Sequence, residues 1–201
     1  MLYRIAIVKS LVLILLLSAA PAQADEILDE IAAARKAYEA GDYSEAVEGL
    51  EFAAQQIRQL QAGRIADALP APLSGWEAEE VESTAMGGAF MGGGIAAGRA
   101  YTRGDAAVDV ELIGEAPMLQ AVLMMLKNPM MISGSGAQVK RIAGYKALIE
   151  FDGGDRSGNI KLVVADAVLV TIDGNNVGQE DLEAYAAAVD YALIEELASG
   201  K

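Results

Sequence analysis

The sequence predicts an α+β protein, built from an N-terminal helical hairpin followed by an antiparallel sheet packed with helices. Two observations support this prediction. Apolar residues recur every three or four positions between residues 25 and about 62, which is the period of a helix. From about residue 95 onward, apolar and polar residues mostly alternate, which is the period of a strand, and two helical stretches occur within this part.

Residues 1–24 have the pattern of a cleavable signal peptide. Arg4 and Lys9 precede the apolar run 11–17, and the small residues Ala22–Ala24 follow it. The apolar run is shorter than the roughly 20 residues that cross a bilayer, although a retained N-terminal anchor stays open as an alternative. We therefore expect a periplasmic protein with no stable membrane span after cleavage. The chain has no cysteine that could carry a lipid anchor.

Composition excludes several kinds of chemistry. Cleavage after Ala24 would leave 177 residues and, by removing two basic residues and no acidic ones, would change the formal charge from −14 to −16. Such a chain is repelled by nucleic acids and by anionic lipids. The chain also has no histidine, so Ser-His-Asp and Cys-His nucleophile systems and ordinary zinc sites are excluded. The prediction is a non-enzymatic protein without a cofactor.

Residues 25–67 are predicted to form the hairpin. Gly41 ends the first helix, and Asp42 or Ser44 caps the second. The stretch "GDYSEAVEGLEFA" resembles the turn and second helix of one tetratricopeptide repeat, although Ala34 stands where that family prefers glycine and no second copy follows. A single repeat cannot form a solenoid groove, so we expect the hairpin to pack on the next domain or on a partner.

Residues 68–75 are predicted to be a linker, because Pro70 and Pro72 prevent a continuing helix. The α+β domain then spans 76–201 and begins with an edge strand near Trp76. The single tryptophan is interpreted as a lid on the core, with ligand stacking as the alternative. The expected strands are 95–102, 106–113, 138–142, 146–151, 159–164 and 168–172, with a hairpin turn at 103–105 and helices over 117–127 and 179–197.

Several segments carry a resemblance to known folds. The order of elements resembles the fold of the PsbP-type photosystem proteins and the Ran-binding nuclear import factors. The segments "LPAPLSGW", "IAGYKALIEFD" and "GNIKLVVADAVLVTIDGNNV" are similar to an uncharacterised family of exported proteobacterial proteins with a PsbP-like domain. This resemblance implies a fold but no activity.

The glycine-rich stretch 85–98 is interpreted as a loop that runs into a strand approached closely by a helix or a ligand. It lacks the lysine of a phosphate-binding loop, no apolar strand precedes it, and its fourteen uncharged residues are too few to span a membrane. The seven methionines after Met1 all lie between residues 86 and 131. Thioethers bind Cu(I), and flexible methionine side chains also suit hydrophobic ligands. The candidate ligand-binding residues are Trp76, Met86, Met91, Met130 and Met131.

The acidic residues indicate a metal or catalytic site less clearly than the methionines indicate a ligand site. The loop at Asp173 begins like a calcium loop, but Val177 and Ala184 stand where ligands should be, so a turn is the better interpretation. Asp109 and Glu111 share one face of a strand, as surface acids commonly do. The sequence thus predicts an exported interaction or accessory protein with an envelope protein as partner. The alternative is a periplasmic carrier of a hydrophobic ligand or of Cu(I) through the methionine-rich segment. An apolar ligand would lie in a cleft between the glycine-rich stretch 85–98 and the methionine-bearing helix over 117–127.

Overall fold

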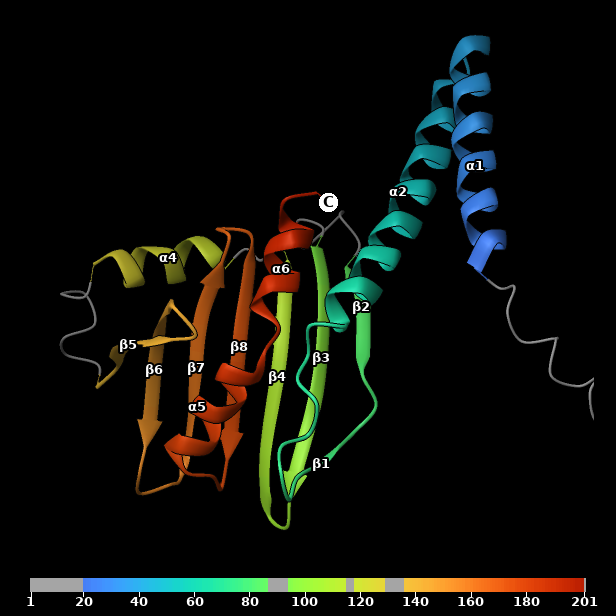
Figure 1. The fold of residues 1–201 in the computed structure, drawn as a ribbon. Helices are drawn as coiled ribbons and strands as arrows, with labels where there is room; N and C mark the ends of the chain where they lie inside the picture. The colour runs from blue at the N-terminus through green and yellow to red at the C-terminus, as the bar shows by residue number, and fades with distance from the viewer. Residues whose placement is uncertain (1–19, 87–93, 115–117, 129–135, 201) are drawn as a thin grey trace, which may run out of the picture. The chain divides into compact units, whose positions relative to one another are not determined.

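The α+β prediction is confirmed by a computed structural model, in which two N-terminal helices precede an eight-stranded antiparallel sheet with helices (Figure 1). The structure describes residues 20–86, 94–114, 118–128 and 136–200. Contacts divide the chain into two compact units, residues 1–57 and 58–201. Each unit is described by itself below.

Helices α1 (Ala20–Ala40) and α2 (Tyr43–Ala66) are joined at the predicted turn. Gly41 has a φ of +87°, which glycine adopts without strain. The Asp42 N–H donates to the Ala37 carbonyl oxygen (2.9 Å), which satisfies a carbonyl at the end of α1. Asp42 Oδ1 accepts from the Glu45 N–H (3.4 Å), so Asp42 is the side chain that caps α2. The predicted signal-peptide cleavage point lies within α1, and cleavage remains a prediction.

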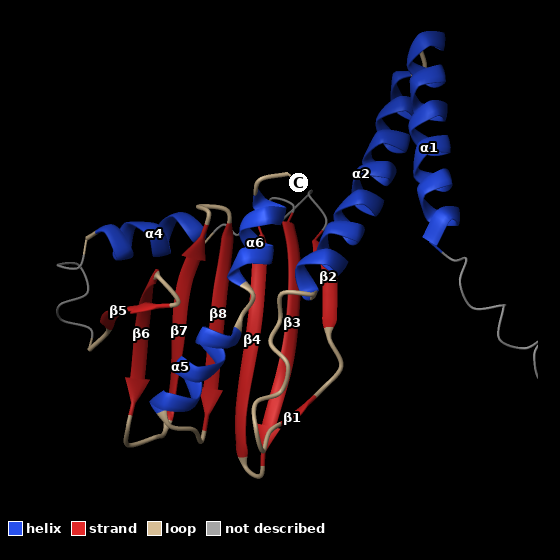
Figure 2. Ribbon diagram, viewed as in Figure 1, coloured by secondary structure: helices blue, strands red, loops and turns tan. Residues whose placement is uncertain are grey.

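The strands form one antiparallel sheet in the order β1-β3-β4-β8-β7-β6-β5, with β2 also pairing with β3 (Figure 2). The predicted hairpin between the long strands is confirmed, with Gly104 in its turn. The sequence did not predict strand β2, which is short, is mostly polar and shows no clear alternation of apolar and polar residues. The bounds are β1 Glu77–Ala78, β2 Glu82–Met86, β3 Gly94–Arg103, β4 Ala106–Gly114, β5 Gln138–Ile142, β6 Tyr145–Asp152, β7 Ser157–Val164 and β8 Val168–Asn175.

Helices cover both faces of the sheet. Helices α5 (Gln179–Ala188) and α6 (Tyr191–Ala198) pack on the face that carries Val110 and Ile172, together with Ile65 from the end of α2. Helix α4 (Leu119–Lys127) packs on part of the opposite face, over Leu148 and Leu169. Strand β4 alternates between buried apolar residues on one face and exposed or partly exposed residues on the other, whereas β8 is buried on both faces from Val168 to Ile172.

The predicted single helix over 179–197 is wrong, because the chain leaves helical geometry at Val189 (φ −64°, ψ 139°). Asp190 then caps α6, with its side chain accepting from the Leu193 N–H (3.0 Å). The Asp190 N–H donates to the Ala68 carbonyl oxygen (3.0 Å), so the break ties the C-terminal helices to the start of the predicted linker.

The glycine-rich stretch connects β2 to β3, and residues 87–93 lie outside the described part. From Gly94 the chain continues as a strand rather than a helix, which excludes a dinucleotide-binding turn. A methyl group at Gly98 would make only an ordinary contact, 3.5 Å from the Val110 carbonyl oxygen, so this glycine does not reflect a close approach. The Gln59 side chain of α2 forms hydrogen bonds with the backbone of β2. Its Nε2 donates to the Ser83 carbonyl oxygen (3.4 Å), and its Oε1 accepts from the Ala85 N–H (3.2 Å).

Candidate functional site

Of the five predicted ligand-binding residues, the structure describes the side chain of Trp76 alone. Trp76 lies in the core of the sheet domain and is only 7% exposed. Met86 ends β2, and only its backbone is described. Met91, Met130 and Met131 lie outside the described residues. The Cu(I) and hydrophobic-ligand alternatives therefore remain predictions.

The indole of Trp76 is enclosed by polar and aromatic neighbours. The Tyr185 ring meets it edge-on, with ring centroids 5.3 Å apart. The Arg103 guanidinium lies 4.4 Å from its centroid and pairs through Nη2 with both carboxylate oxygens of Asp181 (2.9 and 2.8 Å). Because the ring is already in contact on several sides, this arrangement favours the interpretation of Trp76 as a lid on the core.

Helix α4, which carries Met124 and Met125, contacts the sheet through leucine and valine side chains. Leu119, Val122 and Leu126 are buried, which defines one narrow face of the helix. Met118 precedes the helix and is exposed. Met124 and Met125 are also exposed, so these three methionines do not belong to the core.

The two helices of the hairpin meet along a line of small residues. Ala34 and Ala37 of α1 are buried, as are Ala46 and Ala53 of α2. A Cβ at Gly49 would lie 3.1 Å from the Ala34 Cβ, so the helix backbones approach closely here. Small residues permit this approach, and large side chains are consequently left outside the contact line.

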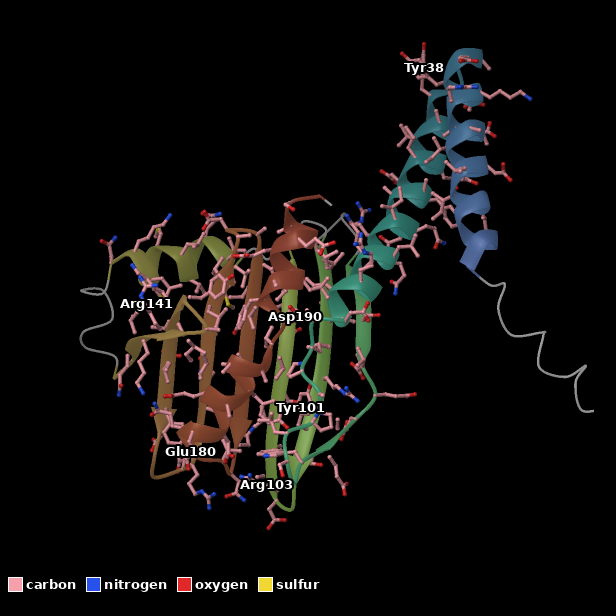
Figure 3. All side chains as sticks on the ribbon, viewed as in Figure 1. Tyr38, Tyr101, Arg103, Arg141, Glu180 and Asp190 are labelled. Atoms are coloured by element: carbon pink, nitrogen blue, oxygen red, sulfur yellow. The ribbon has the colours of Figure 1, made fainter. Side chains whose placement is uncertain are left out.

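The large apolar residues form what we call the hairpin face. They lie one position further around each helix than the contact line, three, four or seven residues apart, and Arg35 and Ala54 occupy the two positions where a row is interrupted. In antiparallel helices this offset points to the same side of the pair, and the Tyr38 and Tyr43 rings, with centroids 5.6 Å apart, meet there at the turn. Figure 3 shows Tyr38 at this end of the hairpin. The members of the hairpin face are between 37% and 64% exposed: Leu28, Ile31, Tyr38, Tyr43, Val47, Leu50 and Ile57.

A second polar surface, the acidic strip, crosses the sheet face beside α4. Asp109 on β4 stands directly opposite Asp173 on β8, with Glu111 two residues along β4. Asn159 pairs with Asp173 and Glu150 pairs with Asn159 in the register of the next strands. Like charges directly opposite one another in a sheet are destabilising. The register of β4 and β8, rather than any local pattern, brings these acids together.

Two carboxyl groups of the strip, those of Asp173 and Glu111, have a raised pKa. Partial loss of hydration raises the pKa of Asp173, with a further rise from Asp109 and an opposing effect of Lys161. Glu111 is exposed by surface area, but partial loss of hydration beside the sheet, followed by the charge of Asp173, raises its pKa. Lys161 Nζ lies 3.8 Å from Glu150 Oε2 and donates to Asn159 Oδ1 (2.8 Å), so its charge is shared across the strip.

Asp173→Asn is expected to stabilise the fold at pH 7 by a few tenths of a kcal/mol, because the Asp173 side chain is exposed and solvent screens its repulsion from Asp109. A raised folded-state pKa means that the folded state binds the proton more tightly than the unfolded state. The contribution of Asp173 is therefore fully stabilising below about pH 4, its unfolded pKa, and is lost as the pH rises through the folded pKa.

Urea unfolding at pH 4 and pH 7 measures this effect. The advantage of Asp173→Asn over the wild type should be present at pH 7 and much smaller at pH 4. Glu77→Gln, at an exposed position of β1, makes the same change in charge and should show little of this pH dependence. An equal effect of Asp173→Asn at both pH values would contradict the prediction.

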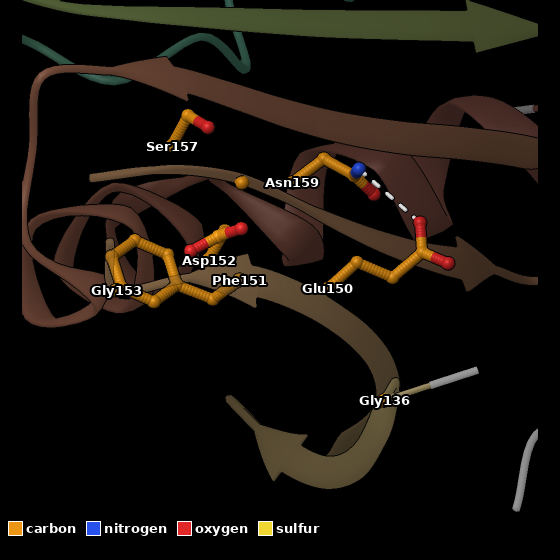
Figure 4. Close-up of a pocket in the computed structure, with 8 residues that line it drawn as sticks. Gly136, Glu150, Phe151, Asp152, Gly153, Ser157 and Asn159 are labelled. Atoms are coloured by element: carbon orange, nitrogen blue, oxygen red, sulfur yellow. Dashed lines mark hydrogen bonds between the residues drawn. The ribbon is translucent and has the colours of Figure 1, made fainter. Parts of the chain in front are cut away.

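A shallow cavity of about 460 Å³ lies at one end of this strip (Figure 4). Asn159 Nδ2 donates to Glu150 Oε2 across it (3.2 Å), and Asp152 Oδ1 accepts from the Gly154 N–H (2.8 Å) in the neighbouring turn. These polar groups satisfy one another, and the lining is not the apolar cleft expected for a hydrophobic ligand. The lining residues are Gly136, Glu150, Phe151, Asp152, Gly153, Ser157, Gly158 and Asn159.

Within the described residues, no group of three or more acidic side chains is arranged to hold a metal ion. Among the helices of that part, none is long and apolar enough to cross a membrane. Comparison with protein-family models, with characterised proteins and with solved structures finds no match to this chain. The resemblances to PsbP-like proteins and to a tetratricopeptide repeat therefore remain predictions.

Proposed function

We propose that the protein is exported to the periplasm and acts there as a non-enzymatic interaction or accessory protein, with the hairpin as its binding element. The hairpin face carries this proposal. It places seven large apolar side chains on one side of two helices, with only small residues buried between the helices. Contiguous exposed apolar surface of this kind is a feature of protein–protein interaction sites.

The sequence supports the remainder of the proposal. Export follows from the basic, apolar and small-residue segments of residues 1–24. A non-enzymatic role follows from the lack of histidine and cysteine, the residue types on which most nucleophilic and acid–base sites depend. The strong negative charge argues against nucleic acid as the partner.

Energetics explain why the hairpin needs a partner. Each large apolar side chain that leaves water contributes on the order of 2 kcal/mol. Helix α1 and the adjoining part of α2 bury chiefly alanines against one another, so the hairpin gains little from its own packing. A partner that covers the hairpin face would supply the burial that two helices cannot supply alone.

Site-specific photocrosslinking in cells tests the proposal. A photoreactive amino acid at Val47, on the hairpin face, is expected to give a discrete product with another polypeptide. The control position is Met124, which is 57% exposed on a helix of the sheet domain. A product from Met124 but none from Val47 would contradict the hairpin as the binding element.

A further inference from the structure

We propose that the hairpin face binds one amphipathic helix with basic flanks from another polypeptide, which lies as a third helix along α1 and α2. This inference rests on the proposed function and specifies the chemistry of the partner. Three features of the hairpin carry it: the spacing of the apolar rows, the charge on their outer sides and the area that they expose.

The spacing of the apolar rows fits a helix. On α1 the row runs from Leu28 to Tyr38, about 15 Å at 1.5 Å per residue, and on α2 from Tyr43 to Ile57, about 21 Å. The close approach at Gly49 keeps the two rows near one another. Two neighbouring rows that follow the helical repeat, each interrupted once, accept the apolar stripe of a third helix of about four turns.

The outer sides of both rows are predominantly acidic. The residue after each row member lies one step further from the contact line, and four of these flanking residues are exposed acids: Asp29, Glu39, Glu48 and Glu51. Among the residues that follow a row member, Arg58 is the one base; Lys36 follows Arg35, which interrupts the row on α1.

The charge of the whole hairpin points in the same direction. Residues 26–57 contain eight acidic and two basic residues, a formal charge of −6. One of the two bases, Arg35, lies 3.7 Å from Glu39 in an ion pair along α1. A helix with lysine or arginine beside its apolar stripe meets complementary charge on this surface. A second copy of the hairpin would bring the same negative charge to the interface, so the charge argues against self-association.

The exposed area is sufficient for one helix. Seven half-exposed large side chains present on the order of 100 Å² each, so an interface that covers both partners buries roughly 1,200–1,400 Å². This lies at the lower end of the range of stable, specific interfaces. We therefore expect a micromolar affinity that weakens as salt screens the flanking charges.

A pair of designed peptides tests whether a helix with an apolar stripe needs basic flanks to bind the hairpin face. Both peptides are 18-residue helices with leucine along one stripe; the first has lysine on both flanks, and the second has glutamate at the same positions. Binding to the purified protein, as processed by the cell, is measured by fluorescence anisotropy at low salt. The lysine peptide is expected to bind with micromolar affinity, at least tenfold more tightly than the glutamate peptide.

Matched variants locate the binding surface. The double substitution Val47→Gln and Leu50→Gln removes two large apolar side chains from the hairpin face without changing its charge. It should weaken binding of the lysine peptide at least tenfold. Met124→Gln makes the same kind of change on α4 and should alter affinity less than twofold. Glu48→Lys with Glu51→Lys should weaken the lysine peptide and strengthen the glutamate peptide. Unchanged circular dichroism of each variant excludes a loss of helix as the cause.

The outcomes separate this inference from the proposed function. Equal binding of both peptides, or no effect of the Gln and Lys variants, overturns the basic-helix inference. A dimer in sedimentation that Leu50→Gln dissociates also overturns it, because the hairpin face would then hold a second copy. If the Val47 crosslink in cells nevertheless captures another protein, the proposed function stands without the inference; if that crosslink is absent, the proposed function fails.

Discussion

Tyr185→Ala is expected to lower the free energy of unfolding by about 3–5 kcal/mol, the usual cost of removing a buried aromatic ring. Tyr185 is fully buried, and its ring contacts Tyr101 (centroids 4.5 Å apart) as well as Trp76. Its hydroxyl accepts from the Leu73 N–H (3.4 Å) in the predicted linker. The substitution would therefore leave a cavity where α5, β3 and the linker meet.

Urea unfolding followed by the fluorescence of Trp76 measures this loss, because Trp76 is the single tryptophan and touches the substituted ring. Tyr185→Phe keeps the ring and removes only the long hydrogen bond, so it should cost about 1 kcal/mol. Tyr43→Ala, on the exposed hairpin face, should cost less than this. A loss below 1 kcal/mol for Tyr185→Ala would show that this aromatic cluster does not hold the domain together.

Gly158→Ala is expected to destabilise the fold by about 3 kcal/mol, the upper part of the usual range for overpacking. A Cβ at this position would lie 2.3 Å from the Glu150 carbonyl oxygen and 2.8 Å from the Phe151 Cα. Both are backbone atoms of the neighbouring strand β6, so no side-chain rotation relieves the clash. The pairing of β6 with β7 would have to open at this end.

Gly63→Ala is the matched control for this prediction. Gly63 lies inside α2, and a Cβ there would have nothing within 4 Å. Alanine is the better helix former, so this substitution should stabilise the protein by up to about 1 kcal/mol. Thermal unfolding of both variants provides the comparison. A Gly158→Ala protein as stable as the wild type would contradict the close approach of β6 and β7 at Gly158.

Strand β4 was predicted well because its apolar residues, which face the core, alternate with polar residues. Along β4, Val108, Val110 and Leu112 are buried while Asp109 and Glu111 are exposed, and this period of two is visible in the sequence. Strand β2 was missed because it has no such alternation and is held by pairing with β3. Its existence depends on a long-range contact that local periodicity does not encode.

The break between α5 and α6 shows a different limit. Apolar residues continue at helical spacing through Val189, so periodicity alone predicts one helix. Asp190 is a good capping residue, and this local feature could have indicated a new helix start. The hydrogen bond from its N–H to Ala68, more than one hundred residues earlier, could not be read from the sequence.

The candidate site was predictable in part. The sequence indicated a hairpin that could bind a partner, but it did not distinguish the alanines that join the helices from the larger residues beside them, such as Val47 and Leu50. That division follows from packing, since a small-residue contact line permits the closest approach of the two backbones. The opposition of Asp109 and Asp173 likewise required the strand register. Of the predicted ligand residues, only the Trp76 side chain is described.

The amide of Gln59 bears on how copies of this protein can associate. A strand at the border of a sheet offers free N–H and C=O groups as a template for a strand of another molecule, which is a common route to aggregation. By bonding to both Ser83 and Ala85, Gln59 occupies two of these groups on β2 in the way that a neighbouring strand would. At the opposite border, β5 carries Lys140 and Arg141, and charged side chains there discourage strand addition. Growth of the sheet from one molecule to the next is thus opposed at both borders, so copies of this protein are not expected to associate by adding strand to strand.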